Sequence, residues 1–165
     1  MQFADPKAHI ADGYAYTRAR ADHIAQILEI ERLSFSDPWS ADSFEREFED
    51  GLARYFIASQ LGADGALTEL VAGFCGYWSI AGEAHITNVA VRPGHRGEGV
   101  GAGLIYAMLC DIRVLGHSAA TLEVREDNFV AMRLYARFGF EITGKRKKYY
   151  DRGTKDALIM WARIC

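Results

Sequence analysis

The segment VAVRPGHRGEGVGA, from Val89 to Ala102, joins an apolar run to a helix-like pattern through a glycine-rich turn. Gly97, Gly99 and Gly101 stand at alternate positions where the helical pattern begins. Glycines let successive backbone N–H groups point into one concavity, and the N-terminus of a helix adds a dipole that favours an anion. The turn therefore predicts a phosphate-binding site, for which a pyrophosphate is the natural guest.

Two familiar phosphate motifs fit this turn less well. The pattern G-x-x-x-x-G-K-[ST] is absent, so the turn is not a P-loop. Gly97–Ala102 satisfies only the relaxed form of the dinucleotide fingerprint, and Glu123 lies inside its strand rather than at the end. A dinucleotide site and a glycine-rich helix entry without a ligand remain as alternatives.

Glu123 is a candidate general base. In the apolar run 120–124 it alternates with Leu122 and Val124, so it faces the side of the strand that Thr121 and Arg125 share. A carboxylate inside a strand needs a polar neighbourhood, which a substrate cleft would supply. The alternative is a structural ion pair with Arg125 or a more distant cation.

A second acid–base candidate follows on the next helical pattern, 128–138. Asn128 is placed to cap that helix. Tyr135 lies further along it and could donate a proton to a leaving thiolate, or could equally be a core tyrosine. On the strand before the glycine turn, His85 either relays protons or is a satisfied structural histidine.

Hydrophobic periodicity predicts the elements that must position these groups. Asp22 and Ser40 are placed to cap the first two helices, and Gly116 to end the third. An edge strand is expected at 13–20, and further strands at 55–58, 70–78, 84–91, 120–124, 140–150 and 157–164. Helices are expected at 22–34, after 40, at about 96–115 and at 128–138. This order predicts one mixed α/β domain over residues 1–165, with 1–12 as a loose lead-in.

Composition narrows the class of protein. The chain has 165 residues and a formal net charge of −3, which argues against non-specific binding of nucleic acid. No apolar stretch is long enough to span a bilayer, and the N-terminus lacks the apolar core of a secretory signal. Three widely spaced cysteines, at positions 75, 110 and 165, are typical of reduced, mostly buried thiols in a cytoplasmic protein and not of a metal site.

The glycine turn and its flanks also carry a family resemblance. Arg96–Gly101 matches R/Q-x-x-G-x-G/A, the coenzyme A pyrophosphate loop of the GNAT superfamily of N-acetyltransferases. The neighbouring family features are His85–Val91, Leu122–Arg125 with Asn128, Leu134-Tyr135 and Gly139-Phe140. Within the superfamily the chain is similar to RimI-type ribosomal-protein alanine N-acetyltransferases, a pattern that includes Pro38–Ser40 and Tyr149-Tyr150. The resemblance covers residues 22–164.

This resemblance implies a fold and a site. The fold is a mixed, mostly antiparallel sheet of six to seven strands with about four helices, splayed where acetyl-CoA enters. Glu123 would be the general base and Tyr135 the general acid. The acceptor would be bound by Trp39, His85, Tyr149 and Tyr150. The cofactor-binding residues would be Val89, Ala90, Val91, Arg96, Gly97, Glu98, Gly99, Val100, Gly101, Ala102 and Asn128.

The resemblance further implies the reaction. Acetyl-CoA is the co-substrate and no metal is needed; the acceptor is a protein N-terminus, expected to be the alanine of a small-subunit ribosomal protein. An α-amine has a pKa of about 7.7–8.0, so a sizeable neutral fraction exists near neutral pH, whereas a lysine amine at about 10.4 is almost wholly protonated. Two alternatives stay open: a small amine or a lysine side chain as the acceptor, and a non-catalytic acyl-CoA-binding module. We favour a cytoplasmic monomer without nucleic-acid or membrane partners.

Two further expectations concern charge. Glu98 in the loop would repel phosphate, so its side chain should point outward. Lys145–Lys148 is the main basic run, read first as a solvated strand end. Steering of a ribosomal substrate, or contact with the 3′-phosphate of the coenzyme, is the alternative.

Overall fold

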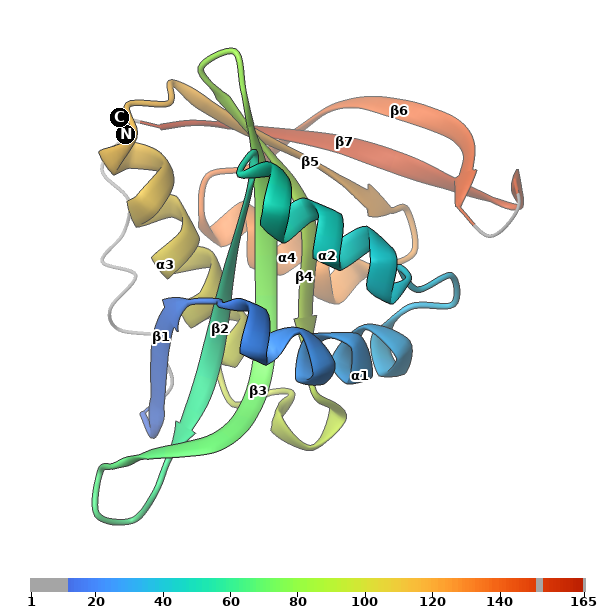
Figure 1. Ribbon diagram of the computed structural model, residues 1–165. Coiled ribbons are helices and arrows are strands. Elements are labelled where there is room, and N and C mark those ends of the chain that lie inside the picture. Colours follow the sequence, from blue (N-terminus) through green and yellow to red (C-terminus); the bar gives the residue numbers. More distant parts are fainter. Residues whose placement is uncertain (1–11, 151–152, 165) are drawn as a thin grey trace.

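The computed structural model describes residues 12–150 and 153–164, which form a seven-stranded sheet with helices on both faces (Figure 1). The element order is the predicted one: a strand, two helices, a three-stranded meander, a helix, a strand, a helix and two strands. The strands are β1 Tyr14–Arg18, β2 Ala53–Leu61, β3 Leu67–Ile80, β4 Glu83–Val91, β5 Ala119–Arg125, β6 Glu141–Tyr150 and β7 Lys155–Arg163. The helices are α1 Ile24–Ser34, α2 Ala41–Asp50, α3 Val100–Val114 and α4 Phe129–Arg137, with 3-10 turns at Ala21–His23 and Pro93–His95.

The sheet has the order β1-β2-β3-β4-β5-β7-β6. Among the described strands only β4 and β5 are parallel neighbours, and their pairing spans just Glu83–Ile86 against Ala119–Leu122. Beyond these residues β4 continues to Val91 and β5 to Arg125 without pairing. Figure 1 shows β5, β6 and β7 turning away from β1–β4. The predicted splay of the sheet is therefore confirmed.

Two apolar layers hold the helices on the sheet. Phe74 of β3 packs with α1 and α2 on one face, whereas its neighbour Cys75 packs with α3 and α4 on the other. This alternation is expected for a central strand, since successive side chains point to opposite faces. Tyr135 of α4 belongs to the second layer. The site described below lies where these layers meet the splay.

Side-chain caps explain where two helices begin. Ser40 accepts a hydrogen bond from the backbone N–H of Ser43, and Asn128 accepts one from that of Ala131, as predicted for both. The predicted cap at Asp22 is wrong. Asp22 lies in the 3-10 turn and its carboxylate binds the guanidinium of Arg20, at 2.7 Å, so α1 begins only at Ile24.

A β-bulge interrupts β4 in front of the splay. Asn88 pairs with Gly76 and Ile86 pairs with Tyr77, which leaves Thr87 as an extra residue in β4. A bulge re-aims neighbouring side chains. As a result His85, Thr87 and Asn88 all line the same cavity.

The cysteines only partly follow expectation. Cys75 is buried, but Cys110 on α3 is exposed because it lies on the face of that helix away from the sheet. Cys165 and the lead-in residues 1–11 lie outside the described residues. No described helix is both long and apolar enough to cross a membrane.

Candidate active site

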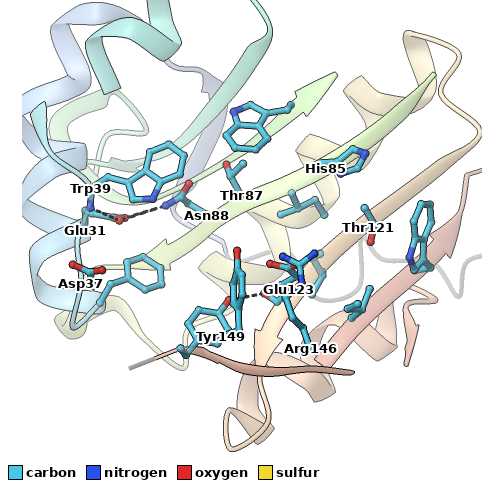
Figure 2. A pocket seen from close by; sticks show the side chains of 17 residues that line it. Glu31, Asp37, Trp39, His85, Thr87, Asn88, Thr121, Glu123, Arg146 and Tyr149 are labelled. Atoms are coloured by element: carbon cyan, nitrogen blue, oxygen red, sulfur yellow. Dashed lines mark hydrogen bonds and ion pairs between the residues drawn. The ribbon is translucent and has the colours of Figure 1, made fainter. Parts of the chain in front are cut away.

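Two cavities adjoin along β4, and Phe35 lines both of them. The first, which we call the loop cavity, has a volume of about 690 Å³ and lies at the start of α3. The second, which we call the acceptor cavity, has a volume of about 610 Å³ and lies between β4, β5 and β6 (Figure 2). The predicted cofactor residues that line the loop cavity are Val89, Ala90, Val91, Arg96, Gly97, Gly99, Val100, Gly101, Ala102 and Asn128.

The glycine turn presents backbone amides to the loop cavity. Gly97 and Gly99 have φ angles of +82° and +88°, the left-handed region that favours glycine. Gly99 directly precedes α3, whose first N–H groups have no acceptor within the helix. A β-carbon placed on Gly97 would meet no atom within 4 Å, so the space over the turn is open. These features fit the diphosphate of a coenzyme.

Arg96 holds the turn in shape. Its Nε donates to the carbonyl oxygen of Val91 at 2.9 Å, and its Nη2 donates to Oγ of Ser34 at 3.2 Å. The guanidinium therefore ties the turn to the end of β4 and the end of α1, while the residue still lines the loop cavity. Arg133 and Arg137 of α4 line the same cavity and add positive charge; sequence reasoning did not single them out.

Glu98 is the one predicted cofactor residue that does not line either cavity. Its carboxylate accepts a hydrogen bond from the hydroxyl of Tyr14 on β1, which also lies 2.7 Å from Nδ1 of His95. Burial, followed by the contact with Glu98, raises the pKa of Tyr14 to about 12. The outward orientation expected for Glu98 is confirmed, and its negative charge is kept away from the loop cavity.

The edge of β4 that faces the splay is available to a ligand. Val89, Ala90 and Val91 pair with β3 on one side, and on the other side β5 has already diverged. An extended chain could bind to this edge as an added strand would. The pantetheine arm of coenzyme A is of suitable shape for this edge.

Tyr135 lies at the inner end of the loop cavity. Its side chain is buried and packs edge-on against Phe140 at 5.8 Å between ring centroids. Burial raises the pKa of Tyr135 well above its ordinary value, so the phenol stays protonated and can act as a proton donor. The two roles that the sequence left open, core residue and acid, are compatible at this position.

Glu123 lines the acceptor cavity from β5. Its Oε1 lies 2.9 Å from Nη1 of Arg146 on β6, so its cation partner is not Arg125, which binds Asp127. The backbone carbonyl of Glu123 accepts a hydrogen bond from the hydroxyl of Tyr150 at 3.1 Å. A hydrogen bond to the Glu123 carboxylate is also the main reason why the pKa of Tyr149 is raised.

The predicted acceptor residues all lie around this cavity. Trp39 forms one wall together with Trp78, at 6.2 Å between ring centroids. Tyr149 and Tyr150 form the opposite side, and His85 lines the floor with Nε2 at 3.9 Å from Glu83. Figure 2 shows Trp39 and Tyr149 on opposite sides of the hollow.

Sequence reasoning missed a buried polar pair in the same cavity. Glu31 of α1 is 1% exposed and Asn88 of β4 is 5% exposed. The side-chain amide of Asn88 donates to Glu31, whose Oε1 also accepts the backbone N–H of Trp39 at 3.2 Å. Burial raises the pKa of Glu31. The available signal was a carboxylate in line with the apolar stripe of α1.

Lys145 and Arg146, the first two residues of the basic run, lie in different surroundings. Lys145 lies 2.8 Å from Glu126 and 2.9 Å from Asp156, and these contacts raise its pKa to about 12. Arg146 instead lines the acceptor cavity. Neither Lys145 nor Arg146 lines the loop cavity, which weighs against the 3′-phosphate as the target of this run.

The arrangement can perform acyl transfer between two ligands. One cavity offers amides to a diphosphate and a protonated phenol, and the adjoining one offers a carboxylate. Among the described residues no group of three His, Cys, Asp or Glu side chains is arranged to hold a metal ion. The site and the splayed sheet fit the class of acyl-CoA-dependent acetyltransferases.

Comparison with known proteins identifies the class. The model of the acetyltransferase (GNAT) family matches residues 24–140, and the chain belongs to this family. Among its relatives is a Bacillus subtilis protein described as a putative [ribosomal protein bS18]-alanine N-acetyltransferase, 38% identical over 151 residues, with 91% of this chain and 95% of that protein covered. The Escherichia coli [ribosomal protein bS18]-alanine N-acetyltransferase is 30% identical over 133 residues, covering 79% of this chain and 84% of that one.

A solved structure supports the same assignment of the fold. The crystal structure of the ribosomal-protein-S18-alanine N-acetyltransferase from Escherichia coli superposes with a TM-score of 0.81 at 25% identity. The match covers 92% of this chain and 94% of that one. The predicted GNAT fold is thereby confirmed.

Proposed function

We propose that the protein transfers the acetyl group of acetyl-CoA to the N-terminal alanine of ribosomal protein bS18, by direct transfer in a ternary complex. The observation that carries this proposal is the meeting of two cavities at the splay of β4 and β5, one suited to a diphosphate and one lined by Glu123. The two relatives at 38% and 30% identity, both described as acting on bS18, support this acceptor.

The coenzyme would bind along the loop cavity. The amides of the turn at 96–102 would hold its diphosphate, and Arg96 would keep the turn in shape. The edge of β4 at Val89–Val91 would bind the pantetheine arm, with one amide polarising the thioester carbonyl. Asn128 would fix the start of α4, and through it the position of Tyr135.

Glu123 and Tyr135 would then carry the proton transfers. Glu123 takes a proton from the α-amine through a water molecule while the amine nitrogen bonds to the acetyl carbon. Tyr135 gives its proton to the sulfur as the carbon–sulfur bond breaks; its phenol is protonated at neutral pH, and burial keeps its pKa above the ordinary value. An α-amine demands little of the base because a sizeable fraction is already neutral near pH 7.

The acceptor peptide would enter between Trp39 and the tyrosine pair Tyr149 and Tyr150. Trp39 and the tyrosine pair line the same cavity as Glu123, so a bound N-terminus would lie near the candidate base. His85 lies on the floor, where it would contact the peptide close to its amine.

Mass spectrometry of reactions with acetyl-CoA tests the proposal. The acceptors are a peptide with the N-terminal sequence of a bacterial bS18, the same peptide with its α-amine blocked, and spermidine. We expect one acetyl group on the α-amine of the first peptide and none on the blocked peptide. Acetylation of spermidine or of a lysine side chain instead would contradict the acceptor, and coenzyme binding without turnover would contradict the enzyme.

A further inference from the structure

Arg146 is the cation that contacts Glu123 in the acceptor cavity. Its Nη1 lies 2.9 Å from Oε1 of Glu123, and its Cζ lies 4.9 Å from the ring centroid of Tyr149. Figure 2 shows Arg146, Tyr149 and Glu123 grouped together at one rim of the cavity. A carboxylate beside the face of an aromatic ring is a good site for an organic cation in general, and a guanidinium is only one of the cations that it can take.

An irregular stretch of β6 directly follows Arg146. The pairing of β6 with β7 jumps from Arg146 opposite Ala157 to Tyr150 opposite Lys155, so β6 bulges between these two points. Lys148 lies within the bulge with a φ of +55°, and its backbone N–H donates to Asp156. The bulge brings Tyr149 to the same cavity as Arg146, because the regular alternation of side chains is lost beyond Arg146.

The ion pair is asymmetric in its exposure. The side chain of Arg146 is 53% exposed, whereas that of Glu123 is 25% exposed. The carboxylate is thus fixed in the cavity, and the guanidinium reaches it from an edge strand with solvent beside it. Such a cation can leave at little cost, since exposed ion pairs contribute only about 0–1 kcal/mol.

The other charged groups of the cavity do not replace Arg146. Glu31 is buried against Asn88 and Trp39, Asp37 is an exposed anion, and His85 lies next to Glu83. Glu123 would therefore lose its cation if Arg146 left and nothing took its place. A second cation that takes its place restores this pairing, so an exchange of cations costs little overall.

We propose that Arg146 stands in for the α-ammonium group of the acceptor and is displaced from Glu123 when the acceptor binds. The acceptor then arrives as a cation, binds between Glu123 and Tyr149, and loses its proton only after the exchange. Arg146 is in this role a specificity-determining residue: it competes with the ammonium for the Glu123 carboxylate, whereas a neutral ligand has no charge with which to displace it. This proposal rests on the proposed function, because it assumes that an amine is the acceptor.

The first test compares the binding of a cationic peptide with that of its neutral analogue. The bS18 peptide and the same peptide with its α-amine replaced by hydrogen are titrated calorimetrically into the protein saturated with coenzyme A. The ratio of the two dissociation constants measures the preference for the ammonium. In Arg146→Gln we expect this preference to rise by about threefold, because the competing cation of a largely exposed pair is gone. Arg146→Lys, which keeps a competing cation, should leave the preference near that of the wild type.

An unchanged or smaller preference in Arg146→Gln would overturn the proposal. If Arg146 had a purely structural role, the affinities of both peptides would fall by the same factor, and the ratio of their dissociation constants would not change. The ratio therefore distinguishes competition between Arg146 and the ammonium from a general distortion of the acceptor cavity.

The second test does not depend on the protein that is acetylated. Protein carrying ¹⁵N-labelled arginine is titrated with alaninamide, which bears an α-ammonium and no peptide sequence, and with its neutral analogue isobutyramide. We expect the side-chain Nε signal of Arg146, assigned with Arg146→Gln, to move and saturate with alaninamide only. If the Arg146 signal does not shift on addition of alaninamide, the exchange is refuted. If the signal shifts but the bS18 peptide is not acetylated, only the proposed acceptor is refuted.

Discussion

Glu31 and Asn88 form a buried pair across the interface of α1 and β4, with Asn88 Nδ2 at 3.3 Å from Oε2 of the carboxylate. The same carboxylate accepts the backbone N–H of Trp39, so one side chain fixes a wall of the acceptor cavity to its floor. Oδ1 of Asn88 is buried without a hydrogen-bond partner in the described part of the chain. A reversed Asn88 amide could satisfy that oxygen if position 31 carried a donor.

Glu31→Gln and Glu31→Ala should therefore differ in stability. Glutamine can accept from Trp39 and donate to Asn88, whereas alanine leaves both groups unpaired, at a cost of about 1–3 kcal/mol for a buried polar group. We expect urea unfolding to show the alanine variant as clearly the less stable of the two. Equal stability of the two variants would mean that Glu31 does not hold these groups.

The same site predicts a pH dependence of folding. Burial raises the pKa of Glu31 in the folded protein above its ordinary value of 4.5. The folded state then binds this proton more tightly than the unfolded state, so its contribution to stability is full below pH 4.5 and is lost as the pH rises through the folded-state pKa. Relative to the wild type, Glu31→Gln should gain stability as the pH is raised. Unfolding free energies of both proteins, measured from pH 4.5 to 8, check the sign.

Glu123→Gln should lower turnover while leaving coenzyme binding intact. Loss of a general base typically costs about 10²–10⁴-fold in rate. Glu126→Gln is the matched control, because Glu126 lies three residues away and also binds a cation of β6, Lys145, but lines neither cavity. If kcat of Glu123→Gln equalled that of the wild type at several pH values, the base would have to be another group.

Gly99→Val should weaken the binding of coenzyme A. Gly99 has a φ of +88°, and a β-branched residue there costs about 1–3 kcal/mol unless the turn changes shape. A changed turn misdirects its amides, so we expect affinity to fall by about tenfold or more. Gly94→Val is the control, because Gly94 is not in the left-handed region and has no atom within 4 Å of an added β-carbon. Calorimetry with coenzyme A measures both, and similar affinities would contradict an amide-lined diphosphate site.

Much of this site could be predicted because local chemistry determines it. The turn at 96–102 needs glycine at Gly97 and Gly99 whatever surrounds it, and the side chain of Asn128 caps α4 by accepting from the backbone N–H of Ala131, three residues on. Trp39, His85, Tyr149 and Tyr150 were placed in one cavity by the family pattern, and the structure does bring them together.

The remaining features depend on contacts between distant segments. Glu31 and Asn88 are far apart in sequence, and only the packing of α1 on β4 joins them. Arg146 belonged to a run of four cations, and only its partner across the cavity, Glu123 on β5, distinguishes it from Lys145, which binds Asp156. The wrong cap at Asp22 has the opposite cause: a nearby cation, Arg20, takes the carboxylate that the helix would have used.

The contact between Tyr16 and Gly103 provides a last prediction, on how β1 is held to α3. A β-carbon on Gly103 would lie 2.0 Å from Cζ of Tyr16, so Gly103→Ala forces the ring to move. Overpacking of this kind typically costs about 1–3 kcal/mol. Because β1 also carries Tyr14, which holds Glu98 away from the loop cavity, the variant should lose coenzyme affinity as well as stability. In a Tyr16→Ala background the ring is gone, and Gly103→Ala should then be neutral or stabilising, as alanine is the better helix former. Urea unfolding of the four proteins in this cycle tests the coupling, and additive effects would show that the two residues do not meet.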